Sequence, residues 1–135
     1  MGALFLVLGL AVPGCQYSVR ELLESEESQV KIRSVQTRTF DTSDRIATLR
    51  AIIATLQDVG FVIDHADYTL GSVSATKLDL YQIRMTVTVR PRGREQLLVR
   101  ANARFNITPI LEPGPYQSFF ASLSKAMFLE AQQVN

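Results

Sequence analysis

Apolar and polar residues alternate along two stretches of the chain, on either side of the segment Pro91–Glu95. If these residues form the loop of an antiparallel hairpin, apolar side chains face one another on one side and polar side chains on the other. The apolar pairs are then Val89 with Leu97, Val87 with Val99, Met85 with Ala101, Ile83 with Ala103, and Tyr81 with Phe105. A slip of one residue would turn one apolar set toward solvent, so the pattern predicts a hairpin with a single buried face.

Apolar residues at three- and four-residue spacing predict an amphipathic helix between the acidic segment Asp41–Asp44 and Gly60. Its apolar stripe consists of Ile46, Leu49, Ile52, Ile53, Leu56 and Val59. The acidic segment offers N-cap residues, and Gly60 can take the left-handed conformation that ends a helix. Phe61 is then placed to complete a Schellman motif with the last turn.

A second amphipathic helix is predicted from Pro115 to the end of the chain. Its stripe consists of Phe119, Phe120, Leu123, Met127, Ala131 and Val134, widened by Phe128 and Leu129. The preceding segment Thr108–Pro115 contains three prolines and a glycine, which predicts no regular structure. On the core face of the hairpin, Ala101 and Ala103 leave room for a helix to approach closely.

The remaining strands are predicted over 30–40, 61–67 and 72–77, with a turn at Leu70-Gly71. In the last of these, Val73 and Ala75 face the core and the residues between them face solvent. The order of elements is strand, helix, four strands and helix. It predicts an α+β fold, a two-layer sandwich in which an antiparallel sheet carries both helices on one face.

This pattern resembles the helix-grip domains of bacterial outer-membrane lipoproteins, such as those of BamC in the barrel-assembly machinery. The resemblance covers roughly residues 30–134 and rests on four segments. They are Thr39–Asp44 leading into the first helix, Leu56–Asp64, the Leu70-Gly71 turn and the closing Tyr116–Leu129 helix. It implies a helix-grip-like architecture and no catalytic motif, since a fold by itself does not define an activity.

An unbroken apolar run, Ala3–Val12, precedes Cys15, the single cysteine. The run is about half the length of a membrane-spanning helix, which needs about 20 apolar residues. It fits the apolar region of a secretory signal. The stretch Val12–Cys15 resembles a lipobox, which implies cleavage after residue 14, acylation of Cys15 and a mature chain anchored to a membrane. An ordinary cleaved signal, an uncleaved anchor and a first buried element remain open as alternatives.

Gln16 after the cysteine resembles the pattern that sorts lipoproteins to the bacterial outer membrane, with the domain facing the periplasm. Residues 15–29 are polar and acidic, which predicts a flexible tether without a stable helix. Residues 30–135 then form one domain, large enough to bury a core without disulfides. The chain has 14 basic and 13 acidic residues. This near-neutral charge argues against nucleic acid as a partner, because such binding depends on phosphate neutralisation.

Few residues suggest chemistry. His65 is the single histidine, and on a regular strand it points away from the face that carries Asp64. We therefore predict a surface histidine and neither a catalytic residue nor a metal ligand. Hard-cation binding by Asp58, Asp64 and Asp67 stays open, although their spacing matches no calcium loop. The sequence predicts no catalytic, cofactor or metal site, and the chain is not expected to be an enzyme.

Arginines are concentrated on the predicted hairpin. Arg90, Arg92 and Arg94 lie at its loop, and Arg84, Arg100 and Arg104 lie on its exposed face. Guanidinium groups bind phosphate and carboxylate groups in a bidentate manner, so these six residues are candidates for partner binding. An ordinary solvated face that discourages edge aggregation is the alternative.

The sequence as a whole predicts a membrane-anchored periplasmic lipoprotein, acting as a non-catalytic accessory or scaffold subunit of an envelope protein complex. Its partners are the membrane, through lipidated Cys15, and an envelope protein. The alternative is a tethered module that binds a lipid or small apolar ligand between helix and sheet. A cavity between the two layers would favour the second function.

Overall fold

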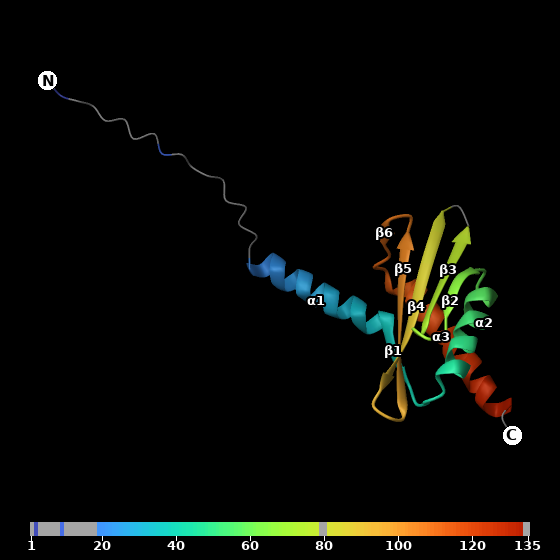
Figure 1. The fold of residues 1–135 in the computed structure, drawn as a ribbon. Helices are drawn as coiled ribbons and strands as arrows, with labels where there is room; N and C mark the ends of the chain where they lie inside the picture. Colours follow the sequence, from blue (N-terminus) through green and yellow to red (C-terminus); the bar gives the residue numbers. More distant parts are fainter. Residues whose placement is uncertain (1, 3–8, 10–18, 79–80, 134–135) are drawn as a thin grey trace.

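A computed structural model describes residues 2, 9, 19–78 and 81–133. The chain forms an α+β two-layer sandwich, in which a six-stranded antiparallel sheet has helices packed on one face (Figure 1). The sheet order is β1-β5-β4-β3-β2, and the short β6 pairs with β5. The strands are β1 Thr37–Phe40, β2 Val62–Asp67, β3 Ser72–Leu78, β4 Gln82–Arg92, β5 Gln96–Phe105 and β6 Thr108–Pro109. The predicted fold class is confirmed.

The first predicted amphipathic helix is confirmed as α2, Arg45–Asp58. Asp44 is its N-cap and accepts a 3.0 Å hydrogen bond from the Ala47 backbone N–H. At the other end Gly60 has φ +93°, and the Phe61 N–H donates to the Leu56 carbonyl at 2.9 Å. Together with the bond from Gly60 N–H to the Gln57 carbonyl, this is the predicted Schellman motif.

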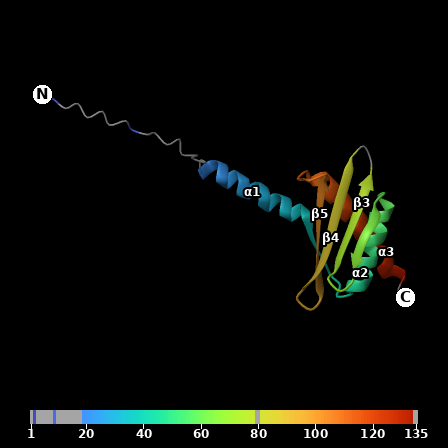
Figure 2. The same cartoon turned by 45° about the horizontal axis from the view of Figure 1, so that its top comes forward.

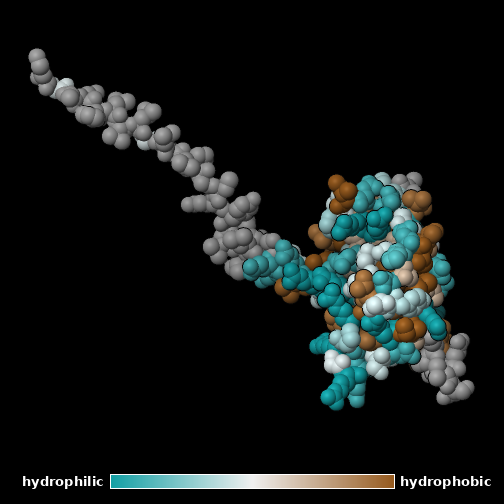
Figure 3. All heavy atoms as spheres, in the orientation of Figure 1, coloured by the Kyte–Doolittle hydropathy of each residue, from teal (hydrophilic) through white to brown (hydrophobic). Residues whose placement is uncertain are grey.

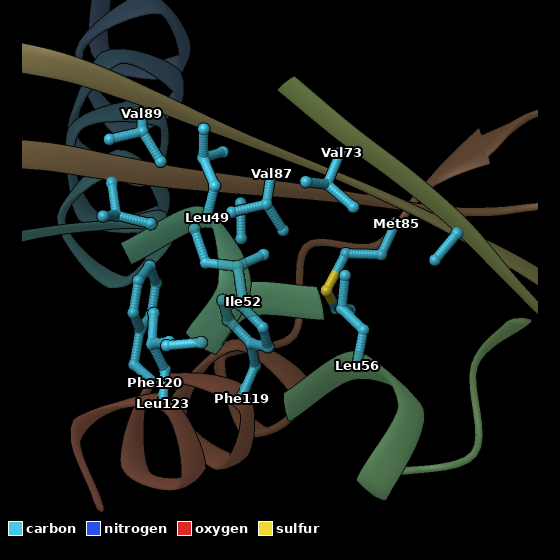
Figure 4. Close-up of a cluster of buried hydrophobic side chains, with 14 of the residues drawn as sticks. Leu49, Ile52, Leu56, Val73, Met85, Val87, Val89, Phe119, Phe120 and Leu123 are labelled. Atoms are coloured by element: carbon cyan, nitrogen blue, oxygen red, sulfur yellow. The ribbon is translucent and has the colours of Figure 1, made fainter. Parts of the chain in front are cut away.

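Helices α2 and α3, Pro113–Gln133, cover the same face of the sheet (Figure 2). The core between the layers is built from buried side chains of both helices and of the central strands (Figure 4). They include Leu49, Ile52 and Leu56 from α2, Phe119, Phe120 and Leu123 from α3, and Val73, Met85, Val87 and Val89 from the sheet. The apolar residues of β4 and β5, and Val73 and Ala75 of β3, therefore face the core as predicted.

The register predicted for the hairpin is wrong by two residues. Val89 pairs with Val99, and Ile83 pairs with Phe105. Arg92 pairs with Gln96, which leaves a tighter turn than the predicted loop, with Gly93 at φ +69°. A shift of two residues keeps the side chains of β4 and β5 on their predicted faces, because side chains in a strand alternate with a period of two. Both strands thus remain apolar inward and polar outward. Tyr81, predicted on the apolar face, precedes β4 and is exposed.

The strand predicted over residues 30–40 is wrong for most of its length. Helix α1 spans Val19–Gln36, and only Thr37–Phe40 forms a strand. The expectation that residues 15–29 lack a stable helix is also wrong for the part from Val19 onward. This segment contains no proline or glycine and is rich in Glu, Gln, Lys, Arg and Leu, which favour helix. Ile32 and Val35, three residues apart on α1, pack against the edge of the core.

Two details of the C-terminal part also differ from prediction. The proline-rich segment includes β6, and α3 begins at Pro113 rather than Pro115, because the first helical turn has free N–H groups and tolerates proline. Phe128 and Leu129 are exposed and do not widen the buried stripe. The side chain of Ala131 is not described, and Val134 lies outside the described residues.

Cys15, the lipobox and all but two residues of the apolar N-terminal run lie outside the described residues. Their role stays a prediction from sequence. Within the described residues, no helix is both long and apolar enough to cross a bilayer.

Candidate functional site

A β-bulge in the edge strand β2 places two neighbouring polar residues on the open face of the sheet. Ile63 pairs with Ala75, and His65 pairs with Ser74, so the register shifts at Asp64. Ile63 and Ala66 pack toward the core, whereas Asp64 bonds to the Thr76 hydroxyl on the opposite, open face at 2.5 Å. The prediction that Asp64 and His65 point to opposite faces is therefore wrong. A bulge adds one residue to the strand and breaks the alternation on which that prediction depended.

Polar side chains form rows across the open face because the strands are paired in register. One row runs from His65 to Ser74, Thr86 and Asn102, each the direct partner of the next. These side chains carry imidazole, hydroxyl and amide groups, all of which can accept or donate hydrogen bonds. The sheet thus presents a line of hydrogen-bonding groups across four strands.

The neighbouring row carries two arginines. Thr76 pairs with Arg84, and Arg84 pairs directly with Arg104 on β5. The Cβ atoms of directly opposed residues in an antiparallel pair lie about 5 Å apart. Arg84 and Arg104 are both exposed, so the open face holds a concentrated positive charge beside the first row.

The first row and the two arginines of the second line a trough of about 710 Å³. Asp64 and His65 line it on the β2 side, and Gln36, at the end of α1, and Pro109 of β6 line it on the β5 side. The side chain of Gln36 is almost fully buried there. The lining residues are Gln36, Asp64, His65, Ser74, Arg84, Thr86, Asn102, Ala103, Arg104 and Pro109.

The six arginines predicted as partner-binding residues are all exposed, but they lie in two groups. Arg84, Arg100 and Arg104 lie on the open face. Arg90, Arg92 and Arg94 lie toward the β4–β5 turn, at the lower end of the domain in Figure 1. Since β4 extends by about 3.3 Å per residue, Arg84 and Arg92 are about 26 Å apart along the strand.

The group near the turn has acidic neighbours. Arg92 donates to the Thr39 hydroxyl at 2.9 Å, and Gln96 donates to the Asp41 carboxylate at 2.7 Å. Asp41 and Glu95 line the same surface hollow as Arg92 and Arg94. The arginines of the trough differ, because Asp64 is the one carboxylate among the described residues that line it.

The acidic residues considered for cation binding are dispersed. Asp67 accepts hydrogen bonds from the backbone N–H groups of Thr69 and Leu70 and so closes the β2–β3 turn. Asp64 is engaged by Thr76, and Asp58 ends α2. Among the described residues, no cluster of three or more His, Cys, Asp or Glu side chains could hold a metal ion.

An apolar pocket of about 190 Å³ lies between the two layers. Its walls are Phe61, Met85 and Phe119 together with neighbouring apolar residues, and Lys77 lies at its margin with its ammonium group 6.0 Å from the centre of the Phe61 ring. Small-molecule sites usually enclose about 300–1,000 Å³. The pocket is below that range.

Sequence analysis identified the arginines and the open polar face but missed the trough. The alternation already placed Ser74, Thr86 and Asn102 on that face. Nothing in the sequence indicated the bulge, which depends on backbone pairing, or the position of Gln36 beside β5. No protein-family model matches the chain, and no curated protein matches it.

Proposed function

We propose that this chain is a lipid-anchored, non-catalytic accessory subunit of the bacterial envelope, whose open sheet face binds a partner. Cys15 supplies the anchor at the outer membrane, and the domain faces the periplasm. Helix α1 acts as a spacer. An 18-residue helix is about 27 Å long, so it would hold the binding face away from the lipid surface. Figure 1 shows α1 projecting from the side of the sheet.

The trough on the open face is the observation that carries this proposal. The opposite face of the sheet is covered by α2 and α3 (Figure 2). The open face carries exposed arginines and hydrogen-bonding side chains. Figure 3 shows hydrophilic residues interspersed with hydrophobic ones in the view of Figure 1. Polar groups on a rigid sheet are already positioned, which lowers the entropic cost of binding.

The small volume of the pocket between the layers favours an accessory subunit that binds a partner over a module that holds an apolar ligand. A ligand-carrying domain needs excess volume between sheet and helices. Here the central residues Ile52, Val87 and Leu123 are completely buried, and the apolar pocket lies at the margin of the core. A lipid chain would have to displace packed side chains to enter.

The proposal is tested by purifying the full-length protein from detergent-solubilised envelope and identifying by mass spectrometry what copurifies. The N-terminal peptide is expected to begin at Cys15 and to carry fatty acyl groups. Cys15→Ser is expected to abolish that modification and release the protein from the membrane fraction. Detection of a peptide beginning at Met1 in the mature protein would contradict the anchor.

A charge-reversal pair tests the role of the exposed arginines. Arg90→Glu combined with Arg94→Glu is expected to reduce recovery of the envelope partner, while Arg50→Glu on the exposed side of α2 is the matched control. All variants should keep the circular dichroism spectrum of the parent protein. Equal recovery with the double variant and the control would exclude Arg90 and Arg94, the arginines near the β4–β5 turn, from the interface.

A further inference from the structure

The open face contains a pair of like charges that a bound anion would stabilise. Arg84 and Arg104 are direct partners on β4 and β5, and both side chains are exposed. Like charges directly opposite each other on a sheet are destabilising. An anionic group bound between the two guanidinium groups would relieve this repulsion and receive paired hydrogen bonds from them.

The adjacent row differs chemically from the arginine pair. His65, Ser74, Thr86 and Asn102 offer hydroxyl, amide and imidazole groups over about 14 Å, the width of four strands. A row of groups that both donate and accept hydrogen bonds suits a ligand rich in hydroxyls. A simple anion such as free phosphate would leave the whole row unused.

Residues at the β2 side and at the β5 side line the two ends of the trough. Asp64 and His65, at the bulge, line the trough at the β2 side, and Gln36 and Pro109 line it at the β5 side. The volume of about 710 Å³ lies within the usual range for specific ligand sites. The trough is open above the sheet, so a short segment of a saccharide fits along the row between its two ends.

We infer that the trough is a binding site for an anionic glycan, with its carboxylate or phosphate group between Arg84 and Arg104 and its sugar hydroxyls on the row from His65 to Asn102. The inference deepens the proposed function, since envelope polymers of this chemistry surround a periplasmic domain. An acidic peptide would also contact the two arginines, but it offers the row one backbone N–H and one C=O per residue, fewer hydrogen-bonding groups than the several hydroxyls of each sugar unit.

The test measures binding of fluorescently labelled probes to the full-length purified protein by fluorescence anisotropy. The probes are a carboxylated hexasaccharide of hyaluronan, pentamannose 6-phosphate, neutral chitohexaose and hexaglutamate. Binding of the first or second probe above chitohexaose and hexaglutamate is expected. The probe that binds more tightly, the carboxylated or the phosphorylated one, identifies which anionic group the site prefers.

Variants separate the two parts of the site. Arg84→Gln with Arg104→Gln is expected to weaken binding of the anionic saccharide at least tenfold, and Arg50→Gln, outside the trough, less than twofold. Asn102→Ala is expected to weaken saccharide binding and leave hexaglutamate binding unchanged. Circular dichroism and urea unfolding of each variant verify that the sheet is intact.

Three results would overturn the inference. They are no saccharide binding, equal binding of chitohexaose, or hexaglutamate binding as tightly as the anionic saccharides with no effect of Asn102→Ala. The last result would identify the trough as a site for acidic peptides. None of these depends on acylation of Cys15 or on recovery of an envelope protein, so the proposed function is tested separately.

Discussion

The Tyr116 hydroxyl accepts a 3.1 Å hydrogen bond from the backbone N–H of Ala103 and thereby occupies a gap at the edge of the sheet. On this edge, β1 pairs with Leu97–Arg100 of β5, and β6 pairs with Arg104 and Phe105. The hydroxyl also donates to the Ile110 carbonyl at 2.5 Å. A helix side chain thus joins α3, β5 and the segment after β6 behind the wall of the trough.

Replacement of Tyr116 by Phe should destabilise the domain by about 1–3 kcal/mol, because the buried N–H of Ala103 would lose its partner. The ring keeps its place in the core, so little packing is lost. Urea unfolding followed by circular dichroism measures the difference. Tyr81→Phe is the matched control, since Tyr81 is 56% exposed and its ring contact with Phe105 is retained. Equal unfolding midpoints for the two variants would contradict this role of the hydroxyl.

The sequence predicted that a helix approaches closely at Ala103, because its side chain is small. It did not predict the hydrogen bond between the Ala103 N–H and the Tyr116 hydroxyl. The alternation of the hairpin fixed which side chains face the core, because that depends only on the period of two. The pairing of Val89 with Val99 depended on the conformation of the turn at Gly93, for which alternation holds no information. Asp64 and His65 lie on the same face of the sheet because of a bulge, and a pattern of alternating residues does not reveal a bulge.

Gly71 and Gly93 have similar φ angles, so substitutions at them separate the free-energy cost of backbone strain from that of steric contact. Gly71 has φ +71° and Gly93 has φ +69°. A Cβ on Gly71 would lie 2.6 Å from the Val89 carbonyl oxygen, whereas a Cβ on Gly93 would meet no atom within 4 Å. Gly93→Ala should cost about 1–2 kcal/mol for the left-handed conformation alone. Gly71→Ala should cost clearly more, since the turn that supports β2 and β3 must also move.

Urea unfolding midpoints of the two glycine variants measure this difference. Gly71→Ala is further expected to disturb the hydrogen bond from the Val89 N–H to the Gly71 carbonyl, which is 2.8 Å long. Faster amide exchange at Val89 in that variant alone would confirm local displacement. Equal midpoints for the two variants would show that the turn relaxes at no cost.

The N-cap of α2 should contribute about 1 kcal/mol to stability. Asp44 accepts from the Ala47 N–H, and an alanine at this position would leave that group to solvent. Asp44→Ala should therefore lower the unfolding free energy by about this amount. Ser43→Ala, at the exposed preceding position, is expected to change it by less than about 0.5 kcal/mol. A smaller effect at Asp44 than at Ser43 would contradict the capping assignment.

Helix α1 should behave as two parts with different energetic roles. Residues from Glu26 to Lys31 are exposed, while Ile32 and Val35 pack against the core and Gln36 is buried beside the trough. Sequence analysis missed this helix because its β-branched residues also fit a strand. Their packing against the edge of the sandwich, which favours the helix here, depends on contacts distant in sequence.

A proline in each part of α1 tests the division. Glu27→Pro should reduce the helical circular dichroism signal, because proline breaks the backbone hydrogen-bond pattern, and should leave the unfolding free energy of the domain within about 0.5 kcal/mol. Val35→Pro should lower that free energy by about 3 kcal/mol or more, since it disrupts the docked turn. It should also weaken anionic saccharide binding by displacing Gln36 from the wall of the trough. Equal destabilisation by both prolines would mean that the exposed part of α1 also supports the fold.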